Sequence, residues 1–326
     1  MPDRRPSLLG FPAITKVSGG AWSGIAACAH KSQEVKVGYT RKGLKPCLKP
    51  LLAVLEEAKL VAQFWLRSCN APCASNVVSF TLELLSNLPR HLRLRLVRAD
   101  SGFCEDRWLS LLEERRLAYI VVAVLHHKIT SLLRQETPWW PSAVPGTDVA
   151  EVIYRGARWS RDRRLILIRH RLSTKTRTGG RMLIECPGYA YQALVTSLPA
   201  AVPPIEVWRD YNGRAGVENV IKELVHGFGP HKLCCKGFWA TEAALSLAVL
   251  TYNLSVLFAR HLGWLEKVTI GTLRFRLFSA AGILSHAQGG THIKLGIPLQ
   301  NRPWWRNIWE KLLSPFPNCN AVAQSP

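Results

Sequence analysis

Two carboxylates lie at positions where the chain could hold catalytic acids. The first, Asp100, directly follows residues 91–99, in which leucines and arginines alternate with the period of two that is typical of a strand. Ligands and catalytic groups gather at the C-terminal ends of strands in open α/β sheets, although an aspartate there often only supports the following turn. The residues alone leave both interpretations of Asp100 open.

The second carboxylate, Glu218, lies in residues 211–224, YNGRAGVENVIKEL, which have the pattern of a helix. A helix would stack four residues on one stripe: Tyr211, Arg214, Glu218 and Lys222. Its apolar residues would form a neighbouring stripe that can face a core: Val217, Val220, Ile221, Leu224 and Phe228. On its own the segment favours an ordinary surface helix, in which i,i+4 ion pairs contribute about 0.2–0.5 kcal/mol each.

The charge balance indicates a polyanionic partner. The chain has 326 residues, with 43 Lys and Arg against 22 Asp and Glu, a formal net charge of +21 and a hydrophobic content of 48%. This length suffices for one large domain or two ordinary ones, and the hydrophobic content can fill a core. The charge is spread along the chain without a polybasic tail, so we expect a folded body with a basic surface. Nucleic acid is the commonest partner of such a surface.

Targeting and redox features predict a cytoplasmic protein without a membrane span. Residues 1–20 lack the apolar core of a signal peptide, and residues 244–259 are too short and too polar for a span, which favours a buried helix. Nine cysteines without a secretion signal predict reduced thiols. A zinc site is a minor alternative, because no CxxC pair occurs. The residues that cluster are Cys69, Cys73, His231, Cys234 and Cys235.

A strand–helix–strand order surrounds Asp100. Residues 76–89 and 105–116 have helical patterns, and the continuous apolar run at residues 118–125 is typical of a strand buried on both faces. This order predicts two parallel strands joined by a right-handed crossover, with Asp100 at the C-terminal end of the first. Residues 51–67 fit one helix or two strands, and periodicity does not decide between them.

Residues 138–204 have a β-rich and basic character. Short runs of β-forming residues alternate with Gly, Pro and Ser, and residues 155–181 hold ten Lys or Arg against one acid, Asp162. Arginines near aromatic residues can bind phosphates and stack on bases, although tryptophans are more often core residues. The candidates for DNA binding are Arg155, Arg158, Arg161, Arg163 and Arg164. Helices are expected after residue 205, with an amphipathic helix in the C-terminal tail.

Several ordered motifs resemble one family of enzymes. The segment VRADSGF at residues 97–103, followed by YNGRAGVENVIKEL, is similar to the DDE transposases of bacterial insertion sequences. More narrowly, it resembles the group numbered thirteen-eighty, within the class that has a Tyr–Arg–Glu–Lys signature. Residues 33–55, 65–71 and 238–258 resemble further segments of the same family, so chance is a poor explanation of the likeness.

The resemblance implies an α/β fold: a ribonuclease-H-like mixed sheet flanked by helices, with a β-rich insertion between the second Asp and the Glu. It favours a hairpin for residues 51–67. Three carboxylates of such enzymes hold two Mg²⁺ (or Mn²⁺) ions about 3.5–4 Å apart for phosphodiester cleavage and strand transfer, because hard cations prefer oxygen ligands. By resemblance, Asp100 is the second carboxylate and Glu218 the third, while Tyr211 and Arg214 contact DNA phosphates.

The same resemblance gives expectations about organisation and partners. We expect a degenerate segment at residues 1–32, the first part of the core at 33–137, the insertion at 138–204, the second part with the Glu-bearing helix at 205–290, and a tail at 291–326. The partner would be the DNA of transposon ends and target, in a bacterial cytoplasm near the nucleoid. A homodimer is a further option.

The chain departs from the family pattern at two positions. The first carboxylate is expected upstream of Gln33, but residues 19–33 contain no acid, and Glu34 belongs to the following loop. The signature lysine is expected at Val225, and Lys222, one turn earlier, is a substitute that can still reach a phosphate. We therefore expect a truncated or frame-altered copy with impaired cleavage, because electrostatic stabilisation of the transition state is lost. The alternative is a non-catalytic, basic DNA-binding remnant.

Overall fold

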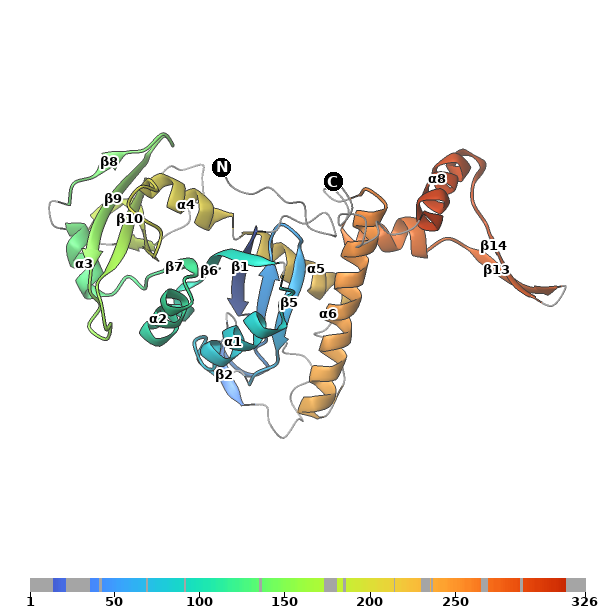
Figure 1. Cartoon of the computed structure of the whole chain (residues 1–326), viewed down its shortest axis with the longest axis horizontal. Helices are drawn as coiled ribbons and strands as arrows, with labels where there is room; N and C mark the ends of the chain where they lie inside the picture. Colours follow the sequence, from blue (N-terminus) through green and yellow to red (C-terminus); the bar gives the residue numbers. More distant parts are fainter. Residues whose placement is uncertain are drawn as a thin grey trace, which may run out of the picture.

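A computed structural model of the chain describes residues 14–21, 36–40, 43–68, 70–90, 92–134, 137–172, 181–183, 186–213, 215–229, 235, 237–264, 269–287 and 290–314. Within these residues, ten strands form one sheet in the order β5-β4-β1-β6-β7-β12-β10-β9-β8, with β11 beside β12. Helices lie on both faces of this sheet (Figure 1). The sheet is therefore the layer that positions the candidate residues.

The first half of the sheet is built around strand β1 (Ile14–Ala21). On one side β1 pairs antiparallel with β4 (Leu51–Leu55), which continues into β5 (Leu60–Trp65) as a hairpin. On the other side it pairs parallel with β6 (Arg93–Ala99). The hairpin that the family resemblance implied is thus confirmed, and all of β4 is buried because both of its faces are covered.

The strand–helix–strand order around Asp100 is also confirmed. β6 leads through α2 (Asp106–Glu114) into β7 (Ala118–Val122), and the two strands are parallel. The helix predicted before β6 is α1 (Val77–Asn87), which ends just before the proline at residue 89. Local patterns therefore placed each of these elements correctly, to within a few residues at their ends.

The two faces of the sheet carry separate cores. Leu51 of β4 joins the apolar cluster that includes α1 and α2, whereas Leu52 joins the cluster that includes α5 (Ala215–Phe228) and α6 (Phe238–His261). Farther along the second face, α4 (Pro204–Asn212) covers β6, β7 and β10. Because successive strand residues face opposite sides, parity along a strand decides which of its residues meet α4 and α5.

The β-rich character of residues 138–204 is confirmed, but these strands do not form a separate sheet. They are β8 (Trp140–Pro141), β9 (Thr147–Tyr154), β10 (Arg163–Arg171), β11 (Arg181–Leu183) and β12 (Cys186–Thr196), and the helix before them is α3 (His127–Arg134). β12 pairs antiparallel with β7. The insertion therefore extends the core sheet across an edge that β7 would otherwise expose.

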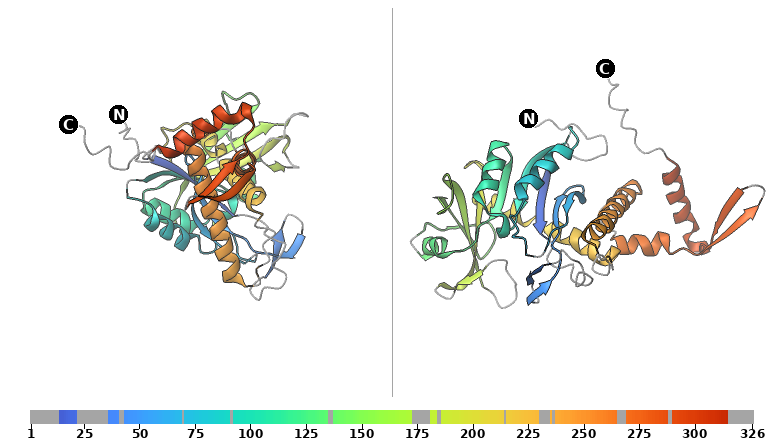
Figure 2. Two further views of the ribbon diagram at one scale, coloured as in Figure 1. Left: turned by 90° about the vertical axis from the view of Figure 1, so that its right-hand side faces the viewer. Right: turned by 90° about the horizontal axis from the view of Figure 1, so that it is seen from below.

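The C-terminal part extends away from the sheet (Figures 1 and 2). After α6 come α7 (Ile270–Leu273), the hairpin of β13 (Gly282–Ala287) and β14 (Gly290–Leu295), and α8 (Arg302–Leu313). The helix expected in the tail is confirmed by α8. A small hairpin of β2 (Val37–Thr40) and β3 (Gly43–Pro46) precedes β4.

The apolar helix after Glu218 is longer than the apolar stretch at residues 244–259. α6 has 24 residues, and by length and composition alone it could cross a membrane, a test that the core helix of a soluble protein also passes. The interpretation as a buried helix holds for one face only. The other face leaves large apolar residues such as Leu247 and Leu250 exposed.

The cysteines differ from the expectation of uniformly reduced thiols. Cys47 is fully buried and disulfide-bonded, whereas Cys73, Cys104 and Cys235 are free. A disulfide needs a second cysteine within reach and an oxidant for the two thiols, so the count of cysteines does not show which of them pair. Other members of the candidate zinc clusters lie outside the described residues: Cys69, His231 and Cys234.

Candidate active site

Asp100 lies at the C-terminal end of β6, as the sequence predicted. Its side chain is exposed, and Oδ1 accepts a hydrogen bond from the main-chain N–H of Ser101 at 2.7 Å. The turn-supporting interpretation is therefore confirmed, and it does not exclude ligand binding. Residues two apart in a strand face the same side of the sheet. Arg98 contacts Asp210 and Gly213, at the end of α4, so Asp100 lies on the face of the sheet that α4 covers.

Glu218 lies in the first turn of α5 with an exposed side chain. The predicted apolar stripe holds the helix in place, because Val217, Val220 and Leu224 are buried against the sheet. α5 also contacts β1, the strand next to β6. Asp100 and Glu218 therefore belong to the same face of the sheet and come from neighbouring elements.

The helix predicted over residues 211–224 is broken near its start. α4 ends at Asn212 and α5 begins at Ala215. Gly213 lies between them, and a Cβ atom at this position would come within 2.6 Å of Nη1 of Arg98. The guanidinium occupies the space that a side chain would need. A larger residue at this position would have to displace the buried guanidinium, and glycine also favours the end of a helix because its helix propensity is the lowest after proline.

The break separates the signature residues, so the prediction that they share one stripe of a single helix is wrong, while their contact with phosphates stays a prediction. Glu218 and Lys222 do lie one turn apart on α5, both with exposed side chains. Tyr211 lies on α4 instead, where it is 8% exposed and packs in the apolar cluster between that helix and the sheet. Arg214 lies outside the described residues. Packing against the sheet, rather than helical periodicity, decides where Tyr211 points.

A buried ion pair that the sequence analysis missed holds this junction. Arg98 is 1% exposed, and its guanidinium pairs with the Glu56 carboxylate and donates a hydrogen bond to the main-chain carbonyl of Asp210. Oε1 of Glu56 also lies 3.3 Å from the Cβ position of Gly213. The Arg98 side chain thus connects β6, the strand that precedes Asp100, with the junction between α4 and α5.

The strand beside Asp100 carries a glycine at the neighbouring position. β1 pairs in parallel with β6, with Ser18 opposite Arg98, and continuing this register by two residues brings Gly20 beside Asp100. Gly20 also pairs with Leu52, which belongs to the cluster on the α5 face. Directly paired residues share a face, so residue 20 adjoins Asp100 on the side that α5 covers. The sequence of β1, ITKVSGGA, supplies no carboxylate there.

Comparison with known proteins shows the family of the chain. Residues 29–314 match the family described as Transposase DDE domain group 1. The chain belongs to this family. Among solved structures, it is similar to the piggyBac transposase in a synaptic complex with hairpin DNA, with a TM-score of 0.48 and 11% identity over 80% of this chain and 51% of that chain. The chain thus spans about half the length of the piggyBac chain. No curated protein matches it.

The described residues do not complete a DDE transposase site with three carboxylates. Among them, no group of three His, Cys, Asp or Glu could hold a metal ion. Asp100 and Glu218 offer oxygen donors of the kind that Mg²⁺ and Mn²⁺ prefer, but the register of β1, continued from Ser18 opposite Arg98, brings a glycine and not an acid beside Asp100. Two carboxylates do not fit a two-metal centre, in which one ligand is shared between the ions.

Two arginines predicted to bind DNA are instead buried in ion pairs. Arg163 is 4% exposed and donates to Asp106 and Glu113 of α2, at 2.6 and 2.7 Å. Arg164 is 8% exposed and donates to Glu151 at 2.8 Å and to main-chain carbonyls that precede α4. Successive residues of β10 face opposite sides, so one arginine fastens α2 and the other fastens the entry to α4. Both side chains are thus engaged within the protein, and a role for either in DNA binding stays a prediction.

The Arg163 pair also changes the acidity of its partner. Burial of Asp106 opposes its ionisation, but hydrogen bonds from Arg163 and Ser160 outweigh burial and lower the pKa of the Asp106 carboxyl. This carboxylate therefore stays ionised at neutral pH. The buried arginine always has a charged partner there.

Three candidate arginines remain at the surface, in the turn between β9 and β10. Arg155, Arg158 and Arg161 are all exposed. Arg155 donates to the main-chain carbonyl of Ser160 at 3.0 Å, and Arg161 lies 3.4 Å from Glu113. Exposed ion pairs are worth roughly 0–1 kcal/mol, so these side chains can turn toward a phosphate at small cost.

We expect exposed and buried arginines to respond in opposite ways to substitution. Arg158→Ala should weaken binding to duplex DNA and reduce the slope of log binding constant against log salt concentration by about one unit. Its free energy of unfolding should change by less than about 0.5 kcal/mol. Arg163→Ala should cost about 2–3 kcal/mol of unfolding free energy, because it removes charged hydrogen bonds from two carboxylates. Fluorescence anisotropy at several salt concentrations and urea unfolding measure the two effects. Loss of DNA affinity in Arg163→Ala at unchanged stability would support the DNA-binding interpretation of Arg163.

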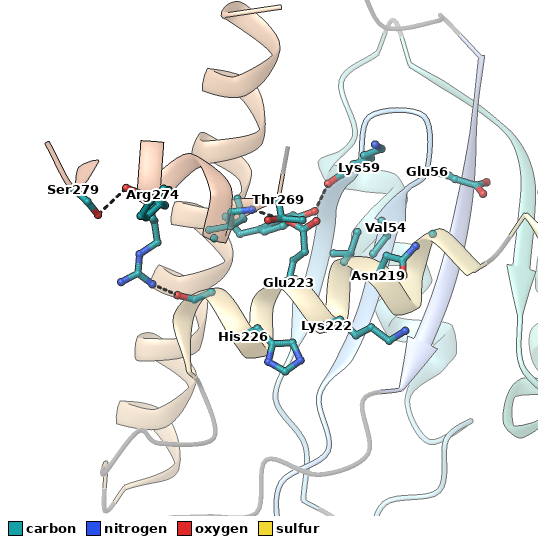
Figure 3. A pocket seen from close by; sticks show the side chains of 17 residues that line it. Val54, Glu56, Lys59, Asn219, Lys222, Glu223, His226, Thr269, Arg274 and Ser279 are labelled. Carbon is teal, nitrogen blue, oxygen red and sulfur yellow. Dashed lines mark hydrogen bonds between the residues drawn. The ribbon is translucent and has the colours of Figure 1, made fainter. Parts of the chain in front are cut away.

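Lys222, the substitute for the signature lysine, lines an open cavity of about 960 Å³ beside α5 (Figure 3). In Figure 3, Lys222 and His226 project from the same side of the helix. Burial raises the pKa of the Glu223 carboxyl in this cavity, although the N–H of Ile270 and the charge of Lys59 counteract it. Charges of both signs line the cavity: Glu56 and Glu223 with Lys59, Lys222 and Arg274. It is therefore not a uniformly basic groove for a phosphate backbone.

Proposed function

We propose that this chain is a DDE transposase of the insertion-sequence group numbered thirteen-eighty whose DNA cleavage is impaired, because glycine replaces the first of three metal-binding carboxylates. Family membership over residues 29–314 supports the transposase assignment. The observation that carries the impairment is the register of β1, which puts Gly20 beside Asp100. Loss of one electrostatic contributor to a transition state typically costs about 10²–10³-fold in rate.

A ribonuclease-H-like core is part of this proposal. Strands β5, β4 and β1 are successive antiparallel neighbours, and β6 and β7 continue the sheet in parallel with β1. α1 precedes β6, and α2 joins β6 to β7. This matches the order that the family resemblance implies: three antiparallel strands, a helix, the strand of the second Asp, a helix and a strand. The Glu-bearing helix α5 then returns to the same sheet after the insertion.

Asp100 and Glu218 remain in this proposal as ligands that hold one Mg²⁺ or Mn²⁺ ion weakly. We expect Asp100→Asn and Glu218→Gln each to lower Mn²⁺ affinity by about tenfold or more, measured by electron paramagnetic resonance titration of free Mn²⁺. Asp162→Asn is the matched control, because Asp162 is an exposed acid in the distant turn between β9 and β10. Equal Mn²⁺ affinity in all three variants would remove Asp100 and Glu218 from the metal site.

A non-catalytic DNA-binding protein is the second candidate function. The net charge of +21 and the exposed Arg155 and Arg158 favour it, since they serve DNA binding whether or not cleavage occurs. Under either function the partner is the DNA of transposon ends and target, close to the bacterial nucleoid. Both functions give an affinity for DNA that falls steeply with salt, so binding alone does not separate them.

Metal-dependent cleavage separates the two functions. The substrate is linear DNA that carries the element's own ends, incubated with Mg²⁺ or Mn²⁺. We expect the wild-type chain to bind this DNA and to cleave it at trace levels. Robust cleavage that Asp100→Ala abolishes would overturn the impairment, because another acid would then be the first ligand. Binding without cleavage, even after a carboxylate is restored at residue 20, would favour the second function.

A further inference from the structure

One face of α6 is fixed to the sheet by packing and by hydrogen bonds. Leu245 and Tyr252 are 1% and 2% exposed. Asn253 exchanges two hydrogen bonds with the main chain of Val61, at 2.8 and 2.9 Å, and Glu242 accepts a third from the N–H of Leu66. These bonds engage main-chain groups of β5, the edge strand of the sheet, and of Leu66, the residue that follows it. They therefore determine which face of α6 is turned outward.

The outward face carries a stripe of small and aliphatic residues, which we call the α6 seam. Its members are Ala240, Ala243, Leu247, Leu250 and Leu254, at spacings of 3, 4, 3 and 4 residues. All five are exposed, and the three leucines are 64%, 53% and 56% exposed in chain order. Alternating spacings of 3 and 4 place residues along the line on which two helices pack together. The pattern thus indicates a partner helix.

We propose that the α6 seam is an interface between two copies of this chain, whose α6 helices pair antiparallel about a two-fold axis between Leu247 and Leu250. A two-fold interface uses the same patch on both copies, so the patch must complement itself. In this register Ala243 of one copy faces Leu254 of the other, which sets a small residue against a large one. Leu247 of one copy likewise faces Leu250 of the other.

Charge favours a second copy at this face. The chain has a formal charge of +21, so two copies repel each other over most of their surfaces. None of the seam residues is charged, and the exposed residues that flank its centre are Ser246 and Thr251. A neutral apolar strip is therefore a place where such a basic chain can meet its own copy without repulsion.

The C-terminal hairpin supplies further apolar surface on the same side. In Figure 1, α6 lies between the sheet and the hairpin of β13 and β14. Leu284 and Ile293 pair directly and so share one face of this hairpin, and they are 61% and 68% exposed. A two-stranded hairpin is marginally stable by itself, so it gains from a covering partner. A second copy seated on α6 would lie next to this surface.

A membrane is the alternative occupant, and the contacts of α6 argue against it. If the helix left the sheet to cross a bilayer, the main-chain groups of Val61 and Leu66 would lose their partners on Asn253 and Glu242. The polar face of α6 would also have to enter hydrocarbon. The membrane is therefore kept as one outcome of the test.

Sedimentation equilibrium of the full chain over a wide micromolar range tests the interface. We expect the wild type to form dimers, and Leu250→Lys to raise the dimer dissociation constant by about 100-fold or more, because it puts a charge into an apolar interface. The matched control is Leu82→Lys, which changes an exposed leucine of α1, 36% exposed, and should leave the dimer intact. Circular dichroism confirms that each variant is folded.

Charge pairing tests the antiparallel register. Leu247→Glu and Leu250→Lys chains should each be monomeric, whereas an equal mixture should form dimers, because residue 247 of one copy faces residue 250 of the other. A mixture that stays monomeric overturns this register. A wild type that is monomeric throughout, or a dimer that Leu250→Lys leaves unchanged, overturns the interface. Binding of a monomeric wild type to phosphatidylglycerol vesicles, lost in Leu250→Lys, would assign the seam to a membrane instead.

Discussion

Gly20→Asp is expected to raise metal-dependent cleavage of the element's end DNA by about 10²–10³-fold. Continued by two residues, the register of β1 brings residue 20 beside Asp100 on the face that α5 covers, so under the proposed function a carboxylate there would complete the set of three with Glu218. The added acid would bind both metal ions, which is the contribution that two carboxylates do not make. Nicking of end-bearing DNA in Mn²⁺ and in Mg²⁺ measures the gain.

The matched control for this gain is Gly20→Asn, which has nearly the same shape without the charge. We expect it to cleave no faster than the wild type. Combining Gly20→Asp with Asp100→Asn should return cleavage to the wild-type level. A second readout is stability: Mn²⁺ should raise the melting temperature of Gly20→Asp more than that of Gly20→Asn, since only the carboxylate adds a metal ligand. A folded Gly20→Asp chain with neither gain would place the first ligand elsewhere.

Elements with a strong local pattern could be predicted from the sequence. Leucines alternating with arginines gave β6, and the strand–helix–strand order gave the parallel pair that puts Asp100 at a sheet edge. The hairpin at residues 51–67 was different, because periodicity fits a helix as well as two strands there. The family resemblance decided that point, and the register of β4 with β5 confirms it.

The arginines show what local pattern cannot supply. Arg158 and Arg163 both belong to one basic stretch, yet one is exposed and the other is buried against acids of α2, which lies far away in the sequence. The partner of a charge is set by tertiary packing, so composition gives the basic surface but not its members. Arg98 did carry a signal. Arg98 is two residues after Leu96 in β6 and so shares the face of the strand on which Leu96 is buried, whereas the exposed Arg95 lies on the other face.

The break at Gly213 has the same origin. A helix from residue 211 to residue 224 fits the apolar periodicity and puts Tyr211 on the stripe of Glu218, although Gly213 has a low helix propensity. Arg98, a side chain from another element, fills the space beside Gly213 at the end of α4. This long-range contact at the start of the Glu218 helix is not visible in the periodicity of residues 211–224.

Glu56→Ala is therefore expected to cause the largest loss of stability, about 3–5 kcal/mol of unfolding free energy. It leaves the Arg98 guanidinium, which is 1% exposed, in the interior without its carboxylate. A domain is stable by only about 5–15 kcal/mol, so the midpoint of urea unfolding should fall markedly. Glu83→Ala, which changes an exposed acid of α1, is the control and should cost less than about 0.5 kcal/mol. A loss below about 1 kcal/mol for Glu56→Ala would contradict burial of the pair.

Removing both charges separates the energetic role of the pair from its positioning role. The double variant with Glu56→Gln and Arg98→Met leaves no charge unpaired, so much of the lost stability should return. It still lacks the hydrogen bond from Arg98 to the Asp210 carbonyl. Amide hydrogen exchange at the start of α5 should therefore be faster than in the wild type, while exchange at Leu245 of α6 stays the same. Unchanged exchange at the start of α5 would mean that packing of Val217, and not Arg98, holds the helix of Glu218 in place.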